Sequence, residues 1–84
     1  MKHFPAQVRA ARGLLALTQQ DLAALSHVSL RTVVQLERGD KPVSPSISQA
    51  IRLSLEAAGV EFLPANGSGP GVRLTRSSED ISEP

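Results

Sequence analysis

The chain has 84 residues, no cysteine and a formal net charge of +1 at pH 7. A chain of this length makes one small domain with little room for a large catalytic cleft. The lack of cysteine excludes disulfides and thiolate metal sites and suits a reducing compartment. No apolar run approaches the roughly 18 residues of a membrane span, and the first residues lack the pattern of a signal peptide. We therefore expect a cytoplasmic protein that is not an enzyme, with no membrane segment, no cofactor and no small-molecule ligand.

The charges are unevenly distributed along the chain. Residues 1–64 carry seven Lys or Arg against five Asp or Glu, whereas residues 65–84 carry two against three. The low net charge gives only weak support to a nucleic-acid partner, because such proteins are usually more basic. The two Phe residues are the only aromatic ones, too few for the base stacking that single-strand and RNA binders use. Any nucleic-acid partner is therefore expected to be duplex DNA.

A first helix is expected to begin near Pro5 and to end near Leu15. Val8, Ala11 and Leu15 recur at spacings of three and four, which is the pattern of an amphipathic helix. Pro5 suits the first turn, where its missing N–H is not needed. Gly13 weakens a helix by roughly 1 kcal/mol relative to Ala, so the helix should not continue far beyond it.

Two short helices follow, and each is preceded by a side chain that can cap it. Thr18 precedes the second helix, and Asp21 stands three residues later, where an acid can complete a capping box. Ser29 is the expected N-cap of the third helix, and Gly39 suits the left-handed residue that ends it. The apolar residues expected on the buried faces are Leu22, Ala23 and Leu25 in the second helix and Val33, Val34 and Leu36 in the third.

A fourth helix is expected to begin at Pro45 and to end at Gly59. Ser44 is a suitable N-cap, and Pro45 is suited to the first helical position. The apolar residues that follow the helical spacing are Ile47, Ala50, Ile51, Leu55 and Ala58.

The remaining residues favour strands and then disorder. Val60–Leu63 is a short β-prone run, and Val72–Arg76 alternates apolar and polar residues. The segment between them is rich in Gly and Pro, so the two runs can pair as a hairpin. Residues 77–84 are rich in Ser, Asp and Glu and cannot bury enough apolar surface to offset their ordering entropy. We expect a disordered tail there.

The second and third helices are joined by only three residues, Ser26, His27 and Val28. So short a connection sets two helices at a steep angle, which is the helix-turn-helix arrangement. A helix is narrow enough to enter the major groove of B-DNA while the preceding helix crosses the backbone. The third helix is therefore the expected reader of base edges.

Three stretches of this region together resemble the XRE/Cro-C1-type family of bacterial and phage repressors. They are Thr18–Ala23, Val28–Val33 and Leu36–Gly39, and the resemblance extends over about residues 6 to 58. It lies in the combination of Gln and Leu-Ala in the second helix, Val-Ser before the third and Glu-x-Gly at its end. The resemblance implies a mainly α, four-helix Cro/C1-repressor-like domain, followed here by a short β-hairpin or by dimerising strands.

The resemblance also implies roles for individual side chains. The residues at base-reading positions are Leu30, Arg31 and Gln35. The residues expected at the DNA backbone are Gln19, Ser29, Thr32, Arg38 and Lys41. Arg12 and Glu37 correspond to a structural ion pair that holds the third helix to the first. His27 stands where the family often has Gly, and it tolerates a positive φ less well than Gly does.

A single helix-turn-helix unit reaches few base pairs, so such proteins commonly bind DNA as twofold dimers. We expect a homodimer, with Leu53, Leu55, Val60 and Phe62 as its apolar surface. The two strands could pair across the subunits or, alternatively, fold as a hairpin onto their own helices. The expected parts of the chain are a helix-turn-helix domain over residues 1–63, the strand extension over 60–76 and the tail over 77–84.

The expected function is that of a sequence-specific regulator of transcription that binds a palindromic double-stranded DNA operator. A repressor is favoured, because the chain has no room for a separate ligand-sensing domain. The alternative is a protein-binding module, such as an antiactivator, or an antitoxin that combines both activities. Leu30 in the reader helix and the low net charge favour a protein partner, whereas Gln19 and the basic residues Arg31, Arg38 and Lys41 favour DNA.

Overall fold

The computed structural model describes residues 3–75, with four helices followed by two strands in that part of the chain. The elements are α1 (Phe4–Leu15), α2 (Gln19–Ser26), α3 (Leu30–Arg38), α4 (Pro45–Ala58), β1 (Val60–Leu63) and β2 (Gly71–Leu74). The expected mainly helical fold is confirmed. The predicted tail and Arg76, the last residue of the second predicted strand, lie outside the described residues.

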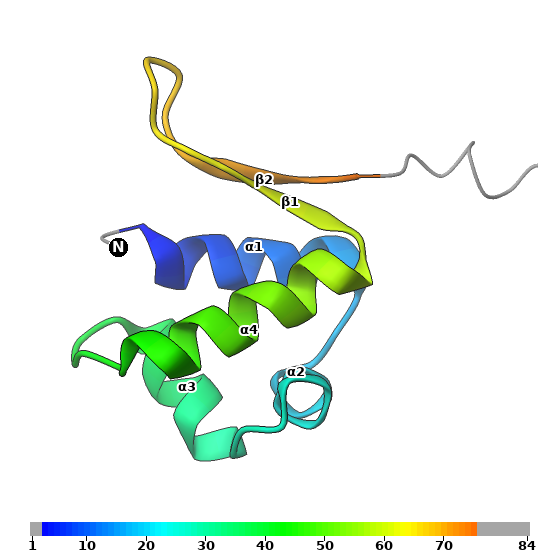
Figure 1. The fold of residues 1–84 in the computed structure, drawn as a ribbon, viewed down its shortest axis with the longest axis vertical. Coiled ribbons are helices and arrows are strands. Elements are labelled where there is room, and N and C mark those ends of the chain that lie inside the picture. Colours follow the sequence, from blue (N-terminus) through cyan, green and yellow to red (C-terminus); the bar gives the residue numbers. More distant parts are fainter. Residues whose placement is uncertain (1–2, 76–84) are drawn as a thin grey trace, which may run out of the picture.

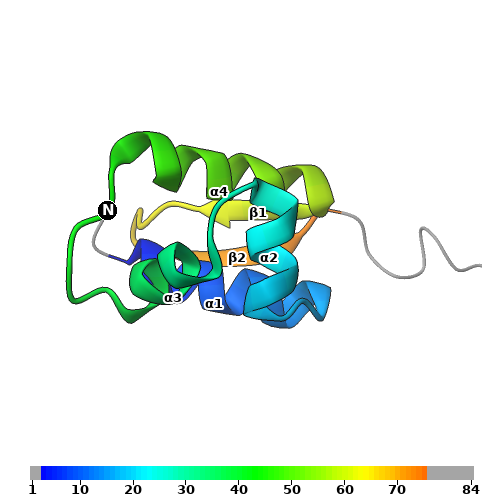
Figure 2. The ribbon, with the colours of Figure 1, turned by 90° about the horizontal axis from the view of Figure 1, so that it is seen from below.

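The elements form three layers (Figures 1 and 2). α1 and α4 occupy the middle layer, the hairpin lies on one side of them, and α2 and α3 lie on the opposite side. β1 and β2 are antiparallel, with Val60 opposite Leu74 and Leu63 opposite Gly71. The strands therefore pair within one chain, which was one of the two arrangements that the sequence left open.

Local hydrogen bonds set the ends of the helices as predicted. The Thr18 hydroxyl accepts a hydrogen bond from the Asp21 N–H at 2.9 Å, and the Asp21 carboxylate accepts one from the Thr18 N–H at 2.9 Å. The Thr18 backbone N–H, followed by the Thr18 side chain, lowers the pKa of Asp21 from its usual value. The Ser29 hydroxyl accepts from the Thr32 N–H at 3.1 Å, and Gly39 ends α3 in the left-handed conformation at φ 73°.

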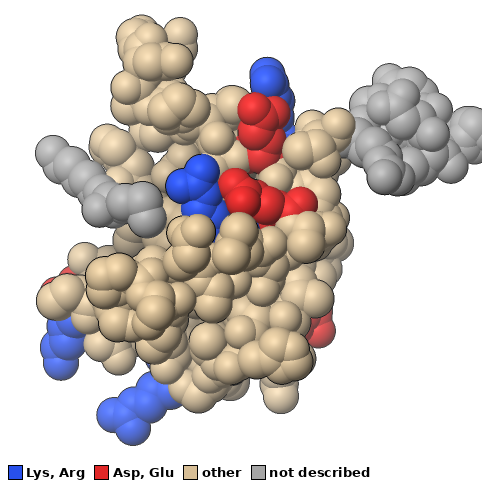
Figure 3. All heavy atoms as spheres, in the orientation of Figure 1, with Lys and Arg blue, Asp and Glu red and all other residues tan. Residues whose placement is uncertain are grey.

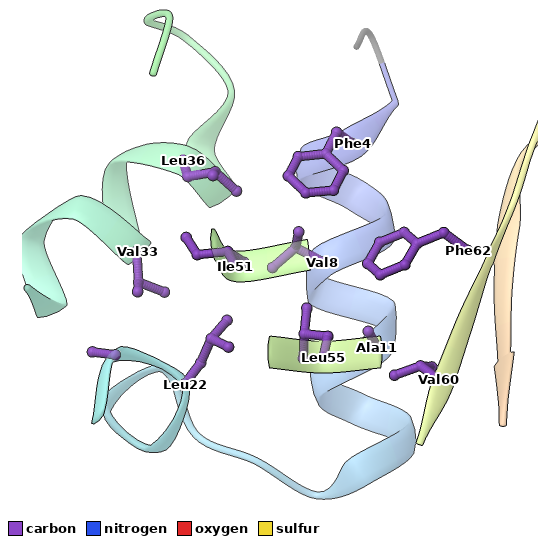
Figure 4. Packing of buried hydrophobic residues seen from close by; sticks show 11 residues of the cluster. Phe4, Val8, Ala11, Leu22, Val33, Leu36, Ile51, Leu55, Val60 and Phe62 are labelled. Atoms are coloured by element: carbon purple, nitrogen blue, oxygen red, sulfur yellow. The ribbon is translucent and has the colours of Figure 1, made fainter. Parts of the chain in front are cut away.

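One apolar core joins the three layers (Figure 4). Phe4 of α1 and Phe62 of β1 meet in it with ring centroids 5.6 Å apart. The buried apolar residues are Phe4, Val8, Ala11, Leu22, Ala23, Val33, Leu36, Ile51, Leu55, Val60 and Phe62. Because β1 supplies two of these side chains, the hairpin shares its core with the helices.

The predicted buried face of α2 is wrong at one position. Leu25 is 45% exposed, and Ser26 is buried in its place beside Leu22 and Ala23. Leu25 stands one residue before Ser26 and is therefore turned about 100° away from it around the helix axis. The Ser26 hydroxyl is satisfied in the core because it donates to the Leu22 carbonyl at 2.7 Å. In the other helices, Val34 is half-buried and Ala58 is exposed.

Three of the four residues expected at a dimer surface lie in the core instead. Leu55, Val60 and Phe62 are 0%, 1% and 9% exposed. The physical reason is the hairpin, which folds back on α1 and α4 and covers the apolar surface that the sequence left unassigned. Leu53 is 52% exposed, so it is the one of these four residues that offers apolar surface to a partner.

Candidate nucleic-acid interface

The turn between α2 and α3 has a left-handed backbone at His27. This residue has φ 59° and ψ 38°, and its N–H closes the end of α2. The next residue, Val28, donates its N–H to the Ala23 carbonyl at 3.1 Å. The chain then enters α3 at a steep angle to α2 (Figures 1 and 2). His27 therefore occupies the conformation that glycine adopts most easily.

We predict that His27→Gly stabilises the protein by about 1 kcal/mol. A left-handed backbone costs a residue that has a Cβ atom roughly 1–2 kcal/mol, and glycine avoids this strain. Part of the gain is lost because glycine makes the unfolded chain more flexible and so raises its entropy. Urea unfolding measures the change. The matched control is His27→Ala, which keeps the Cβ atom and should leave the stability near that of the parent. An equal gain in both variants would show that the imidazole, not the backbone, is the source of strain.

The predicted base-reading residues lie on the side of α3 that faces away from the core. Arg31 is exposed, Leu30 is 42% exposed, and Gln35 is half-buried one helical turn beyond Arg31. The opposite side of the helix carries Val33 and Leu36, which are 0% and 3% exposed. One face of α3 thus packs against the core, and the other face is turned to solvent.

Polar and basic residues border this exposed face at both of its ends. The Ser29 and Thr32 hydroxyls lie 2.8 Å apart at the start of α3. Arg38 and Lys41 are exposed at its other end, and Figure 3 shows basic side chains projecting from the lower part of the molecule, where Figure 1 places α3. Arg38 lies 3.8 Å from Asp40, with both side chains more than half exposed. So exposed an ion pair contributes little to stability.

Glu37 at the end of α3 is a buried carboxylate, only 3% exposed, held by Arg12 of α1. Arg12 Nε donates to Glu37 Oε2 at 2.7 Å, and Arg12 Nη2 donates to Glu37 Oε1 at 2.9 Å. This two-point contact, together with the neighbouring negative charge, raises the pKa of Arg12. Arg12 Nη1 also donates to the Leu17 carbonyl at 3.0 Å. The expected ion pair is therefore present, and it ties α3 to both α1 and the segment before α2.

A family model described as helix-turn-helix matches residues 8–55, which is more than half of the chain. The chain belongs to the XRE-type helix-turn-helix family. No relative among the curated proteins matches it. The matched region runs from α1 into α4 and leaves the hairpin outside. Membership makes the protein a DNA-binding regulator of the XRE type.

Two contacts of this helix-turn-helix regulator that support α3 were not predicted from the sequence. Arg9 donates from Nη1 to the backbone carbonyl of Glu37. Gln19, the first residue of α2, donates from Nε2 to Glu37 Oε1 at 3.0 Å. Arg9 and Arg12 stand three residues apart and therefore share one face of α1. This spacing is the signal from which a contact of both residues with α3 could have been predicted.

A third unpredicted contact ties the hairpin to α1. Gln7 donates from Nε2 to the Leu63 carbonyl at 3.2 Å and to the Gly71 carbonyl at 3.0 Å. These partners lie 56 and 64 residues away along the chain. No local pattern in the sequence could have indicated this contact.

Residues 3–75 include two His, two Asp and three Glu residues, whose side chains are of the kinds that bind metal ions. No group of three or more His, Asp or Glu residues in that range is placed to hold a metal ion. None of the helices described there is long and apolar enough to cross a membrane.

Proposed function

We propose that the protein is a cytoplasmic homodimeric repressor that binds a palindromic operator with α3 in the major groove. The observation that carries the proposal is the division of α3 into two faces. Val33, Leu36 and Glu37 pack α3 against the rest of the domain, while Arg31 is exposed and Gln35 is half-buried on the outward side. A helix whose orientation is fixed by its inner face can hold its outer side chains at constant positions along a groove.

The exposed side chains of α3 have the chemistry for direct readout. Arg31 can donate to guanine O6 and N7 with two parallel N–H groups, and Gln35 can pair with adenine N6 and N7. Leu30 can pack against a thymine methyl group. Arg31 and Gln35 are four residues apart and therefore point to the same side of the helix. These two side chains would meet neighbouring base pairs.

The proposed contacts to the DNA backbone lie on both sides of the reader. Within residues 3–75, the backbone N–H groups of Gln19 and Gln20 have no hydrogen-bond partner, so the start of α2 can receive a phosphate oxygen. The Gln19 side chain would contact the same phosphate. The remaining backbone contacts would come from Ser29, Thr32, Arg38 and Lys41.

A dimer would double the length of DNA that is read. Its half-sites would lie about 34 Å apart, one helical turn of DNA. Leu53 supports this part of the proposal, because among residues 3–75 it is the most exposed of the large apolar residues, at 52%. Its position on α4 lies outside the proposed reading surface of α3. Repression would then depend on protein concentration or on a regulatory protein partner.

The proposal predicts different effects for Arg31→Ala and Gln19→Ala on DNA binding. Arg31→Ala should weaken binding to the operator by about 1–3 kcal/mol and leave binding to mixed-sequence DNA nearly unchanged. Gln19→Ala should weaken binding to both DNAs by similar factors, because a phosphate contact carries no sequence information. Mobility-shift titrations against the region upstream of the protein's own gene and against a mixed-sequence duplex, each at two salt concentrations, measure both effects.

The rival function is binding to another regulatory protein through the same helices. Leu25 and Leu30 favour it, since they are 45% and 42% exposed next to the turn. The absence of any shifted species at micromolar protein, together with a stable complex with a protein partner, would reject the repressor proposal. Equal effects of Arg31→Ala on operator and mixed-sequence DNA would reject base reading by this residue.

A further inference from the structure

The buried carboxylate of Glu37 holds two side chains at once. Its Oε2 accepts from Arg12 Nε at 2.7 Å, and its Oε1 accepts both from Arg12 Nη2 at 2.9 Å and from Gln19 Nε2 at 3.0 Å. Gln19 comes from the start of α2, and Glu37 comes from the last turn of α3. One group therefore joins the expected phosphate contact to the end of the reading helix.

The acceptor that holds Gln19 is itself fixed. Glu37 is 3% exposed, and the fork of Arg12 engages both of its oxygens. A glutamine on an open helix surface samples several rotamers and loses that freedom when it binds a ligand. The Gln19 side-chain amide has two N–H groups on Nε2, and one of them donates to Glu37 Oε1 on the protein side. The other N–H of the amide remains for an acceptor on the solvent side.

The charge of Glu37 would repel a phosphate if nothing compensated it. Arg12 neutralises the carboxylate at hydrogen-bond distance, so Glu37 can stand behind Gln19 without presenting net negative charge to DNA. Arg12 thus has a second effect besides its link between α1 and α3.

We propose that Glu37 is a positioning residue for DNA binding, which holds the Gln19 amide in its phosphate-binding rotamer before DNA arrives. The inference rests on the proposed function, because it takes Gln19 as a contact to a backbone phosphate. Since the same carboxylate is part of α3, it also sets the phosphate contact at a fixed distance from the base-reading side chains. Glu37 itself touches no DNA.

A double-mutant cycle on DNA binding tests the proposal. The probe is a fluorescein-labelled mixed-sequence duplex of about 20 base pairs, roughly two helical turns. Gln19→Ala and Glu37→Ala should each weaken binding about tenfold, and the double variant should bind no more weakly than either single variant. Circular dichroism gives the folded fraction of each variant, and the dissociation constants refer to folded protein.

The matched control is Arg9→Ala. Arg9 also supports the end of α3, but it donates to the backbone carbonyl of Glu37, whereas Gln19 donates to the Glu37 carboxylate. Its effect on DNA binding should therefore add to that of Gln19→Ala. If Glu37→Ala is additive with Gln19→Ala in the same way, Glu37 supports α3 only and the proposal is overturned.

A second measurement needs no variant and so does not depend on the folding of Glu37→Ala. The heteronuclear NOE of the Gln19 side-chain Nε2 in the DNA-free protein should report an ordered group. Gln20, whose side chain is exposed on the same turn, is the internal reference for a mobile one. Equal mobility of the two side chains would overturn the proposal. If the parent protein binds no duplex at all, both the proposed function and this inference are rejected. If it binds DNA but the Gln19 side chain is mobile, only this inference is rejected.

Discussion

Arg12→Ala should lower the free energy of unfolding by about 3 kcal/mol or more, the usual cost of removing one partner from a buried ion pair. The cost is large because Glu37 is 3% exposed, and its carboxylate would be left in the interior without the side chain that engages both of its oxygens. Gln19 would still donate to it, but a neutral amide compensates a buried carboxylate poorly. The variant would also lose the hydrogen bond to the Leu17 carbonyl. Urea unfolding followed by circular dichroism measures the effect.

The matched control is Arg73→Ala, which breaks an ion pair at the surface. Arg73 Nε lies 2.9 Å from Glu61 Oε1, but the two side chains are 64% and 44% exposed. Water replaces the lost partner there, so the expected loss is below about 1 kcal/mol. Equal losses for Arg12→Ala and Arg73→Ala would mean that solvent reaches Glu37, and the buried network would then not explain how α3 is held.

Leu55→Ala should destabilise the protein by about 2–5 kcal/mol, the range for removing a large aliphatic side chain from a packed core. Leu55 is fully buried between the helices and the hairpin. Its cost should not depend on protein concentration, because its neighbours belong to the same chain. Urea unfolding at several protein concentrations tests both the size of the loss and this independence.

Leu53→Ala separates the core from the proposed dimer surface. Leu53 is two residues away on the same helix but 52% exposed. We expect this variant to change the stability of the folded chain by less than about 1 kcal/mol and to raise the dissociation constant of the dimer in sedimentation experiments. A concentration-dependent loss in Leu55→Ala, with none in Leu53→Ala, would contradict this division of roles.

The ends of the helices could be predicted because they depend on neighbours in sequence. Thr18 and Asp21 satisfy each other across three residues, and Ser29 reaches Thr32 across the same distance. These contacts form wherever the local backbone turns into a helix, whatever the rest of the chain does. The end of α3 at Gly39 could be predicted in the same way, because it depends only on the left-handed backbone conformation of this residue.

The outward face of α3, which is the proposed reading surface, was predictable for a different reason. Arg31 and Gln35 lie on the side of α3 away from the buried Val33 and Leu36, so the period of the helix already places them on the outward side. The ion pair between Arg12 and Glu37 was predicted from the resemblance to the family. In the structure, Arg12 Nε lies 2.7 Å from Glu37 Oε2. The bond from Gln19 to Glu37 could not be anticipated, because an amide at the start of a helix has many possible partners.

The sequence by itself determined the helices, their order, the short turn at His27 and the outward face of α3. Each of these follows from spacing and local hydrogen bonding over a few residues. Only the tertiary structure decided that Val60 and Phe62 of the hairpin join the core, because their burial depends on segments that meet from far along the chain. The hairpin covers Leu55 and is tied down by Gln7 across 64 residues, and it leaves Leu53 outside. The same long-range packing brings Gln19 to Glu37 and so joins the start of α2 to the end of α3.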